Sequence, residues 1–417
     1  MKKLVWEGHP IMNGANTAFV LFSAALVMLM TPGLALFYAG MARSKNVLAT
    51  IMQNFVLLGV IGIQWAIIGY SLAFGPDIGG FVGNLDYIGL NGVGAAPFAT
   101  YSDSIPHFAF MIFQAMFAII TPALITGAWA ERLKFSSFLV FIILWATLVY
   151  DPVCHWVWGD GGWLKNLGAL DFAGGTVVHI NAGVAALAAA LVLGKREGYG
   201  KEAFIPHNLP MTVLGAGLLW FGWFGFNAGS ALAADGLAAT AFVTTHLATC
   251  AAVISWLVVE WIFRGKPTTL GAATGAVAGL VAVTPAAGFV GPMSAILIGL
   301  GAGFLCYLAC LLKVKLGYDD SLDVVGVHGV GGLWGALATG LFASVAVNEA
   351  GANGLFFGNP AQFGIQVVAV LVTMVYSFVL SWILLKVVDA VMGLRVSKED
   401  EVAGLDLTEH QEAGYSL

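Results

Sequence analysis

Charged side chains are scarce in this chain. Lys, Arg, Asp and Glu together make up 10% of the 417 residues, and hydrophobic side chains make up 59%, whereas an ordinary soluble domain is about 25% charged. A water-soluble fold could not bury that much apolar surface. The composition therefore predicts an all-α membrane protein, and the 54 glycines fit helices that pack closely in lipid.

The sequence also has few cysteines and no basic patch with interleaved aromatic residues. The lack of such a patch argues against nucleic acid as a partner. The four cysteines lie in or beside apolar segments without His or acidic residues at ligand spacing; they are Cys154, Cys250, Cys306 and Cys310. We interpret them as packing thiols, and we expect no metal site, no cofactor and no enzyme activity.

Eleven apolar segments are long enough to cross a membrane, which takes roughly 20 helical residues. They cover approximately residues 15–41, 47–74, 107–130, 136–157, 172–194, 209–229, 239–263, 269–288, 292–313, 322–346 and 364–393. The sequence thus predicts a multi-pass protein of the cell inner membrane, with eleven transmembrane helices in residues 1–393 and a tail at 394–417.

The positions of Lys and Arg predict the orientation, because basic loops stay in the cytoplasm. Basic residues follow the first, third, fifth, seventh, ninth and eleventh spans, at Arg43/Lys45, Arg132/Lys134, Lys195/Arg196/Lys201, Arg264/Lys266, Lys313/Lys315 and Arg395/Lys398. We therefore expect an N-out/C-in protein with a cytoplasmic tail. Lys2 and Lys3 oppose this and raise the possibility of a signal peptide, but the long apolar stretch running into Arg43 favours a retained first helix.

Spans one to five, about residues 15–194, and six to ten, about 209–346, have the pattern of two inverted five-helix repeats followed by a last helix. An odd number of spans per copy places the copies in opposite orientations. Asp171 precedes His179 by eight residues, and Asp320 precedes His328 by eight as well. At about 1.5 Å per residue, each imidazole enters roughly 12 Å from opposite faces, so both reach the midplane.

Ionisable groups inside spans are costly and usually functional. A single His could simply join two helices by a hydrogen bond, and a pair could bind a metal, but no carboxylate or thiol stands at ligand spacing. Two imidazoles at matching depth favour a pathway for a small polar substrate or a proton. We therefore predict that His179 and His328 line a pore.

Aromatic residues and one hydroxyl occur near the predicted outer mouth: Phe113, Phe117, Trp158, Phe226 and Ser230. Aromatic faces attract cations and a hydroxyl can accept a hydrogen bond, although aromatic residues also favour membrane interfaces. Asp171 suits the N-cap of a helix better than direct cation binding. The acidic tail could be either a solvated disordered end or a docking element.

The string from Asp171 to Asn181, Asp-Phe-Ala-Gly-Gly-Thr-Val-Val-His-Ile-Asn, resembles the signature of the ammonium transporter/methylammonium permease/Rhesus family, in its bacterial or archaeal form. Further similar strings cover nearly the whole chain in order: Gly127-Ala-Trp-Ala-Glu-Arg132, Pro206-His-Asn-Leu-Pro210, Gly222-Trp-Phe-Gly-Phe-Asn-Ala-Gly-Ser230, Gly265-Lys-Pro267, Asp323-Val-Val-Gly-Val-His-Gly329 and Gly393-Leu-Arg-Val396.

This resemblance implies a homotrimer with one pore per subunit. It implies an outer recruitment site made by Trp158, Ser230 and Phe113, a stacked gate of Phe117 and Phe226, a twin-histidine lining of His179 and His328, and a structural acid at Asp171. The tail, with Gly404-Leu-Asp406, resembles tails regulated by PII-type signalling proteins.

The sequence thus predicts a channel-like ammonium transporter, with methylammonium as an analogue. Ammonium would be recognised at the mouth, lose its proton and cross as ammonia, because a bare cation is costly in the membrane; the released proton either stays behind or is carried separately. The rival interpretations are an ammonium sensor that signals through its tail and a Rhesus-type gas channel.

Overall fold

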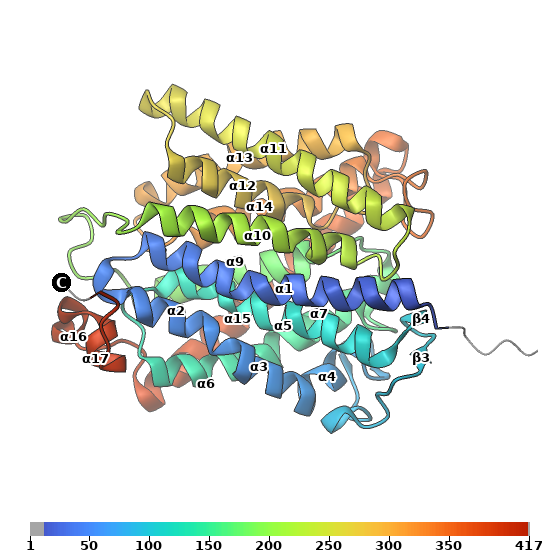
Figure 1. Cartoon of the computed structure of the whole chain (residues 1–417), viewed down its shortest axis with the longest axis horizontal. Coiled ribbons are helices and arrows are strands. Elements are labelled where there is room, and N and C mark those ends of the chain that lie inside the picture. Colours follow the sequence, from blue (N-terminus) through green and yellow to red (C-terminus); the bar gives the residue numbers. More distant parts are fainter. Residues whose placement is uncertain (1–11, 416–417) are drawn as a thin grey trace, which may run out of the picture.

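A computed structural model describes residues 12–415 of the chain. Its long helices run roughly side by side, with connecting loops at both ends of the bundle (Figure 1). One end of the bundle carries Trp158 and the strands β3 (Pro97–Phe98) and β4 (Ser102–Pro106), and we call it the Trp158 end. The chain finishes at the opposite end, which we call the tail end. Lys2 and Lys3 lie outside the described residues.

Within residues 12–415, ten helical segments are long and apolar enough to cross a membrane. Several of them combine consecutive helices. In order they contain α1 (Gly14–Met41); α2 (Val47–Phe55), α3 (Leu57–Gln64) and α4 (Tyr70–Phe74); α5 (His107–Trp129); α6 (Phe135–Trp145), α7 (Asp151–Trp158) and α8 (Trp163–Leu167); α9 (Asn181–Leu193); α10 (Leu209–Gly229); α11 (Gly236–Arg264); α13 (Pro292–Leu316); α14 (Val330–Phe342); and α15 (Pro360–Met392).

The predicted eighth span is shorter than expected. Helix α12 covers only Thr269–Val283, whereas the hydrophobic pattern continues to residue 288. Pro285 explains the difference, because proline has no N–H for the helical hydrogen bond. With α12 included, the bundle has the eleven apolar helices that the sequence predicts.

Four spans contain a widened π-helical turn, a feature often found at functional sites. These turns are η2 (Trp65–Gly69), η4 (Ala146–Tyr150), η5 (Gly175–Ile180) and η6 (Val325–Gly329). The last two carry His179 and His328. Each histidine thus lies on a π-turn that leads into a regular helix, α9 or α14.

Glycines allow the two halves of the chain to cross closely beside these histidines. A Cβ on Gly183 would lie 2.3 Å from the Gly329 nitrogen, and a Cβ on Gly332 would lie 2.9 Å from the Cβ of His179. Each half therefore presses a glycine against the π-turn of the other. The same relationship holds in both directions, and the inverted repeat itself stays a prediction.

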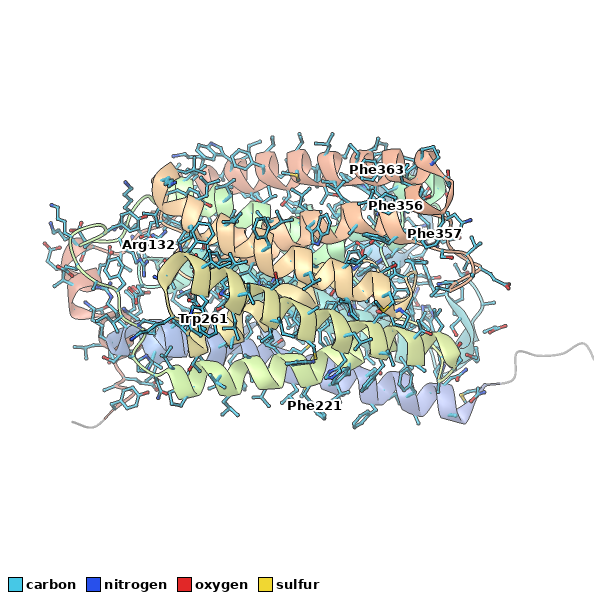
Figure 2. The ribbon with its side chains drawn as sticks, turned by 90° about the horizontal axis from the view of Figure 1, so that it is seen from above. Arg132, Phe221, Trp261, Phe356, Phe357 and Phe363 are labelled. Carbon is cyan, nitrogen blue, oxygen red and sulfur yellow. The ribbon has the colours of Figure 1, made fainter. Side chains whose placement is uncertain are left out.

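Many large apolar side chains on the outer helices face away from the bundle. Phe221 on α10 and Trp261 on α11 are 53% and 61% exposed, and they lie on the surface of their helices (Figure 2). A soluble protein rarely exposes apolar surface on this scale, so these faces fit a lipid environment.

The tail is folded and packed against the bundle. Residues Lys398–Ala403 form α16 and Leu405–His410 form α17, beside the start of α2 at the tail end (Figure 1). The interpretation of the tail as a solvated disordered end is therefore wrong for its described residues. Leu405 and Asp406 are buried, which makes the tail part of the folded protein.

Candidate functional site

A cavity of about 320 Å³ opens at the Trp158 end of the bundle. Trp158 and Ser230 both line it, together with Gln114 and Asp171. The Ser230 hydroxyl donates to the Phe226 carbonyl over 2.8 Å, which leaves its oxygen lone pairs available to a cation or N–H donor. The indole N–H of Trp158 donates to the Asp171 carbonyl over 2.8 Å and thereby fixes its ring.

Three of the predicted aromatic side chains meet below this cavity. The rings of Phe117 and Phe226 lie 4.2 Å apart between centroids, and Trp158 meets Phe117 edge-on at 5.8 Å. Phe113 is fully buried against Phe117 and does not line the cavity. Phe117 does not line the cavity either, and its ring meets that of Phe113 edge-on at 5.0 Å.

The two histidines lie next to each other on the far side of the Phe117–Phe226 pair. Nδ1 of His328 is 3.3 Å from Nδ1 of His179, and both side chains are buried. The His179 ring stacks at 6.1 Å from Phe226 and at 5.4 Å from Trp223. Nε2 of His179 is buried without a protein hydrogen-bond partner among the described residues, so it can bind a small polar molecule.

A second, very small cavity adjoins the histidines. Its volume is about 10 Å³, close to the space one water-sized molecule requires. Apart from the two histidines its lining is apolar and aromatic, with Met30, Leu34, Ile120, Leu124, Val178, Leu219, Trp223, Phe226 and Val277. Such a site accommodates a small neutral molecule and disfavours a permanent ion.

Acidic residues hold the starts of both π-turns. The Asp171 carboxylate accepts hydrogen bonds from the N–H groups of Gly174, Gly175, Thr176 and Val177 and from the Thr176 hydroxyl. Asp320 accepts from the Val325 N–H over 2.8 Å. The predicted capping chemistry of Asp171 is present, but Asp171 lies before the helix rather than at its N-cap, which is Gly174. All these bonds occupy the Asp171 carboxylate, which favours a structural role.

Sequence reasoning missed several residues around the site. Trp223 was not singled out, although it precedes Phe226 by three residues and therefore shares its helical face. Gln114, next to Phe113, lines the cavity at the Trp158 end. Asp151, an acidic residue inside the fourth predicted span, was also missed, and its position in an apolar segment was the available signal.

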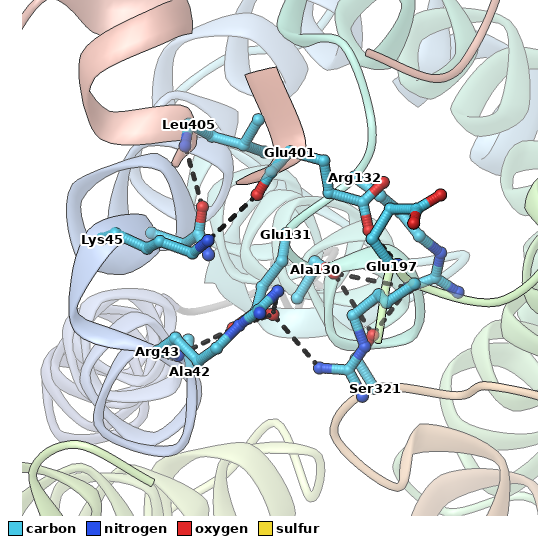
Figure 3. A network of polar contacts seen from close by, with 12 residues as sticks. Ala42, Arg43, Lys45, Ala130, Glu131, Arg132, Glu197, Ser321, Glu401 and Leu405 are labelled. Carbon is cyan, nitrogen blue, oxygen red and sulfur yellow. Dashed lines mark hydrogen bonds and ion pairs between the residues drawn. The ribbon is translucent and has the colours of Figure 1, made fainter. Parts of the chain in front are cut away.

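A buried ionic network ties together the loops at the tail end (Figure 3). Arg43 pairs with Glu131 at 2.7 Å, and Arg196 pairs with Asp319 at 2.9 Å and with Glu131 at 3.4 Å. Burial alone raises the pKa of Glu131, but the guanidinium groups of Arg196 and Arg43 outweigh burial and lower it overall. The pKa of Asp319 is lowered in the same way by Arg196, against the effect of burial. Both carboxylates therefore remain charged.

The tail is held at the same end of the bundle through Glu401 and Asp406. Arg395 donates to Glu401 over 2.7 Å, and the Glu197 N–H donates to the same side chain over 2.7 Å. Asp406 accepts from the Ala49 N–H over 2.8 Å, near the start of α2. Its contacts with Glu197 and Ala49 thus bind the tail to two separate parts of the bundle.

Comparisons with known proteins agree with this geometry. The profile of the Ammonium Transporter Family matches residues 18–415. The chain belongs to the ammonium transporter family. The family assignment confirms the predicted ammonium transporter of the cell membrane, and it argues against an enzyme.

Relatives of the ammonium transporter family match nearly the full length. An ammonium transporter of Bacillus subtilis is 54% identical over 97% of this chain and 99% of its own length, and Amt1 of Archaeoglobus fulgidus is 50% identical over 97% and 100%. The crystal structure of Candida albicans Mep2 is 36% identical, with a TM-score of 0.88 over 93% of this chain and 87% of that one. A structure named Sensor Amt Protein is 32% identical, with a TM-score of 0.87 over 95% and 98%.

Proposed function

We propose that this transporter recruits ammonium in the Trp158 cavity and conducts it as ammonia past His179 and His328. The observation that carries the proposal is the adjacency of the two imidazoles, 3.3 Å apart, in an apolar cavity of about 10 Å³. The indole face of Trp158 attracts the cation, and the Ser230 oxygen accepts one of its N–H bonds.

Deprotonation occurs where the cavity narrows at Phe117 and Phe226. The N–H bond of ammonium breaks, its electron pair stays on nitrogen, and the proton passes to a water molecule in the Trp158 cavity while ammonia enters the apolar passage. Ammonia then donates an N–H to the free Nε2 of His179 and continues along His328; at the tail end it binds a proton from water. This order supports selection against potassium and sodium, because neither ion has a proton to release.

Uptake of labelled methylammonium by vesicles that contain only this protein tests the proposal. Saturable uptake that excess ammonium suppresses is the expected result, and uptake unaffected by ammonium contradicts it. Current recorded on adding ammonium separates the two fates of the proton: an imidazole relay that carries the proton gives current, whereas a proton left behind gives none.

We also propose assembly into a homotrimer, in which the exposed face of α11 is covered by another copy. His246 supports this, because it lies on the exposed side of α11 within an apolar span, and an ionisable side chain facing lipid is costly. The mass of the purified protein in detergent tests it: a mass of three chains is expected, and one chain contradicts it.

The packed tail supports a second candidate, regulation by a PII-type protein or sensing with little transport. Glu401 and Asp406 connect the tail to loops at the tail end, so an event at the tail can act on the bundle. Deletion of residues 394–417 separates the functions: a transporter still takes up methylammonium, whereas a sensor loses only its signal. Co-purification with a PII-type protein tests the partner.

A further inference from the structure

Asp151 is a buried acidic residue that does not line either cavity of the transport path. It begins α7 within the fourth span. Its Oδ2 accepts a hydrogen bond from Nε2 of Gln64 over 2.9 Å. Among the described residues it forms no ion pair with Lys, Arg or His. A charged carboxylate without a cation is strongly disfavoured at this position.

Two further atoms of this pair have no hydrogen-bond partner. Asp151 Oδ1 and Gln64 Oε1 are both buried and unsatisfied among the described residues. With an ionised carboxyl group, both atoms are acceptors and neither can satisfy the other. A proton on Asp151 Oδ1 turns that atom into a donor, and Gln64 Oε1 is an unpaired acceptor on the residue already bonded to Oδ2. One proton can therefore provide a bond for both atoms.

The backbone is shaped to hold the Gln64 amide in place. Gln64 directly precedes the π-turn η2, and Asp151 directly follows the π-turn η4. A Cβ on Gly69 would lie 2.8 Å from Oε1 and 3.0 Å from Nε2 of Gln64. The amide therefore rests on its own helix where only a glycine leaves enough space.

Helix α7 connects this pair to the outer cavity. Trp158 ends the helix that Asp151 begins, and a separation of seven residues places both on one helical face. Between them, His155 contacts the Ala73 carbonyl and the Asp77 carboxylate, each at 2.9 Å. The position of Trp158 thus depends on how α7 is held against α3 and α4.

We propose that Asp151 is an uncharged carboxylic acid that forms a two-hydrogen-bond acid–amide pair with Gln64, and that this pair positions α7 and Trp158. Gln64 donates an N–H to Oδ2, and Asp151 donates its O–H to Oε1. Asp151 is a positioning residue for the outer site. Its effect on uptake rests on the proposed function of Trp158, whereas its protonation does not.

Infrared spectroscopy of the purified protein in lipid tests the protonation directly. The spectrum of the wild type minus that of Asp151→Asn, at neutral pH, is expected to show the carbonyl band of a protonated carboxylic acid, and the band should move when aspartate is labelled with carbon-13. If the difference spectrum shows only bands of an ionised carboxylate, Asp151 is charged and the proposal is overturned.

Uptake kinetics test the positioning. Asp151→Asn retains one donor and one acceptor toward Gln64, so KM for methylammonium should stay within about twofold of the wild type. Asp151→Leu and Gly69→Ala should raise KM several-fold at equal amounts of folded protein. The double variant Gln64→Glu/Asp151→Asn exchanges acid and amide and should restore KM. Equal impairment by Asn and Leu at position 151 overturns the proposal.

Trp158→Ala separates a failure of the proposed function of Trp158 from a failure of the proposed acid–amide pair. A raised KM in this variant supports the proposed outer site, and the kinetics above then report on α7. An unchanged KM contradicts the proposed function of Trp158, and the infrared result alone then decides whether Asp151 is an uncharged acid. If Asp151→Leu does not fold, the exchange variant and the spectra remain decisive.

Discussion

Nδ1 of His179 lies 3.3 Å from Nδ1 of His328, although the two residues are separated by 149 positions in the chain. Two facing Nδ1 atoms can share one hydrogen bond only when one carries a proton and the other does not. In the neutral pair, one imidazole therefore has Nε2 as an acceptor and the other has Nε2–H as a donor. The pair offers both kinds of contact to a molecule that passes along it.

Replacing both histidines, in His179→Ala/His328→Ala, should abolish selective uptake, because the apolar passage then has no hydrogen-bonding group to replace the hydration of ammonia. Labelled methylammonium uptake, measured with and without excess ammonium, checks this, and size-exclusion chromatography verifies that the variant is folded. Persistence of saturable, ammonium-sensitive uptake in the double variant means that the pair is not the path.

Removing one ring of the gate should make the protein leak. In Phe226→Ala the ring that lies 4.2 Å from Phe117 is lost, so water from the cavity at the Trp158 end reaches His179. Water permeability of vesicles, followed by light scattering, should rise several-fold. Phe224→Ala is the matched control, because Phe224 stacks on Phe242 instead, at 3.9 Å. Equal water permeability of the two variants counts against the gate.

Glu131→Gln should destabilise the protein by up to about 3–5 kcal/mol, because it removes the carboxylate partner of Arg43 and one of the two partners of Arg196. The folded-state pKa of Glu131 is lowered, so its stabilising effect is complete above the ordinary pKa of about 4.3. The effect is lost as the pH falls through the lower folded-state value.

Thermal unfolding of wild type and Glu131→Gln in detergent, from neutral to acid pH, checks both parts of this prediction. The difference between their midpoint temperatures should be largest at neutral pH and should shrink only below about pH 4. A difference that stays constant down to the most acid pH contradicts an ionised Glu131.

Asp406→Ala should loosen the tail without unfolding the bundle. The substitution removes the acceptor for the Ala49 N–H, and losing a cap of this kind costs about 1 kcal/mol. Hydrogen exchange at residues 398–410 should accelerate, while exchange in α5 and α9 stays slow. Glu399→Ala is the control, because Glu399 is exposed. Identical exchange in both variants indicates that Asp406 does not hold the tail.

Gly183→Ala should destabilise the crossing of the two halves. The added Cβ would lie 2.3 Å from the Gly329 nitrogen, and overpacking of this kind costs at least about 1–3 kcal/mol. Gly217→Ala is the control, because no neighbouring atom lies within 4 Å of a Cβ there. The midpoint temperature of thermal unfolding should fall for Gly183→Ala and not for Gly217→Ala. An unchanged midpoint in Gly183→Ala contradicts the close approach.

Much of the fold could be predicted from the sequence because lipid imposes a simple rule on it. A span must be helical and apolar over roughly 20 residues, so the helices, with the exception of the end of α12 at Pro285, follow from hydrophobic length alone. The equal spacing of Asp171 to His179 and of Asp320 to His328 likewise predicts, without any knowledge of contacts, that both imidazoles lie at the same depth.

Only the tertiary structure decided which side chains face one another. Phe113 and Phe117 are one turn apart in sequence, yet packing sets the Phe117 ring 4.2 Å from that of Phe226 and the Phe113 ring edge-on to Phe117 at 5.0 Å. The hydrogen bond between Asp151 and Gln64 and the docking of the tail through Asp406 also depend on contacts between distant segments. Hydrophobic period and spacing determine depth and helical face, whereas the rotation of each helix about its axis is set by close packing with its neighbours.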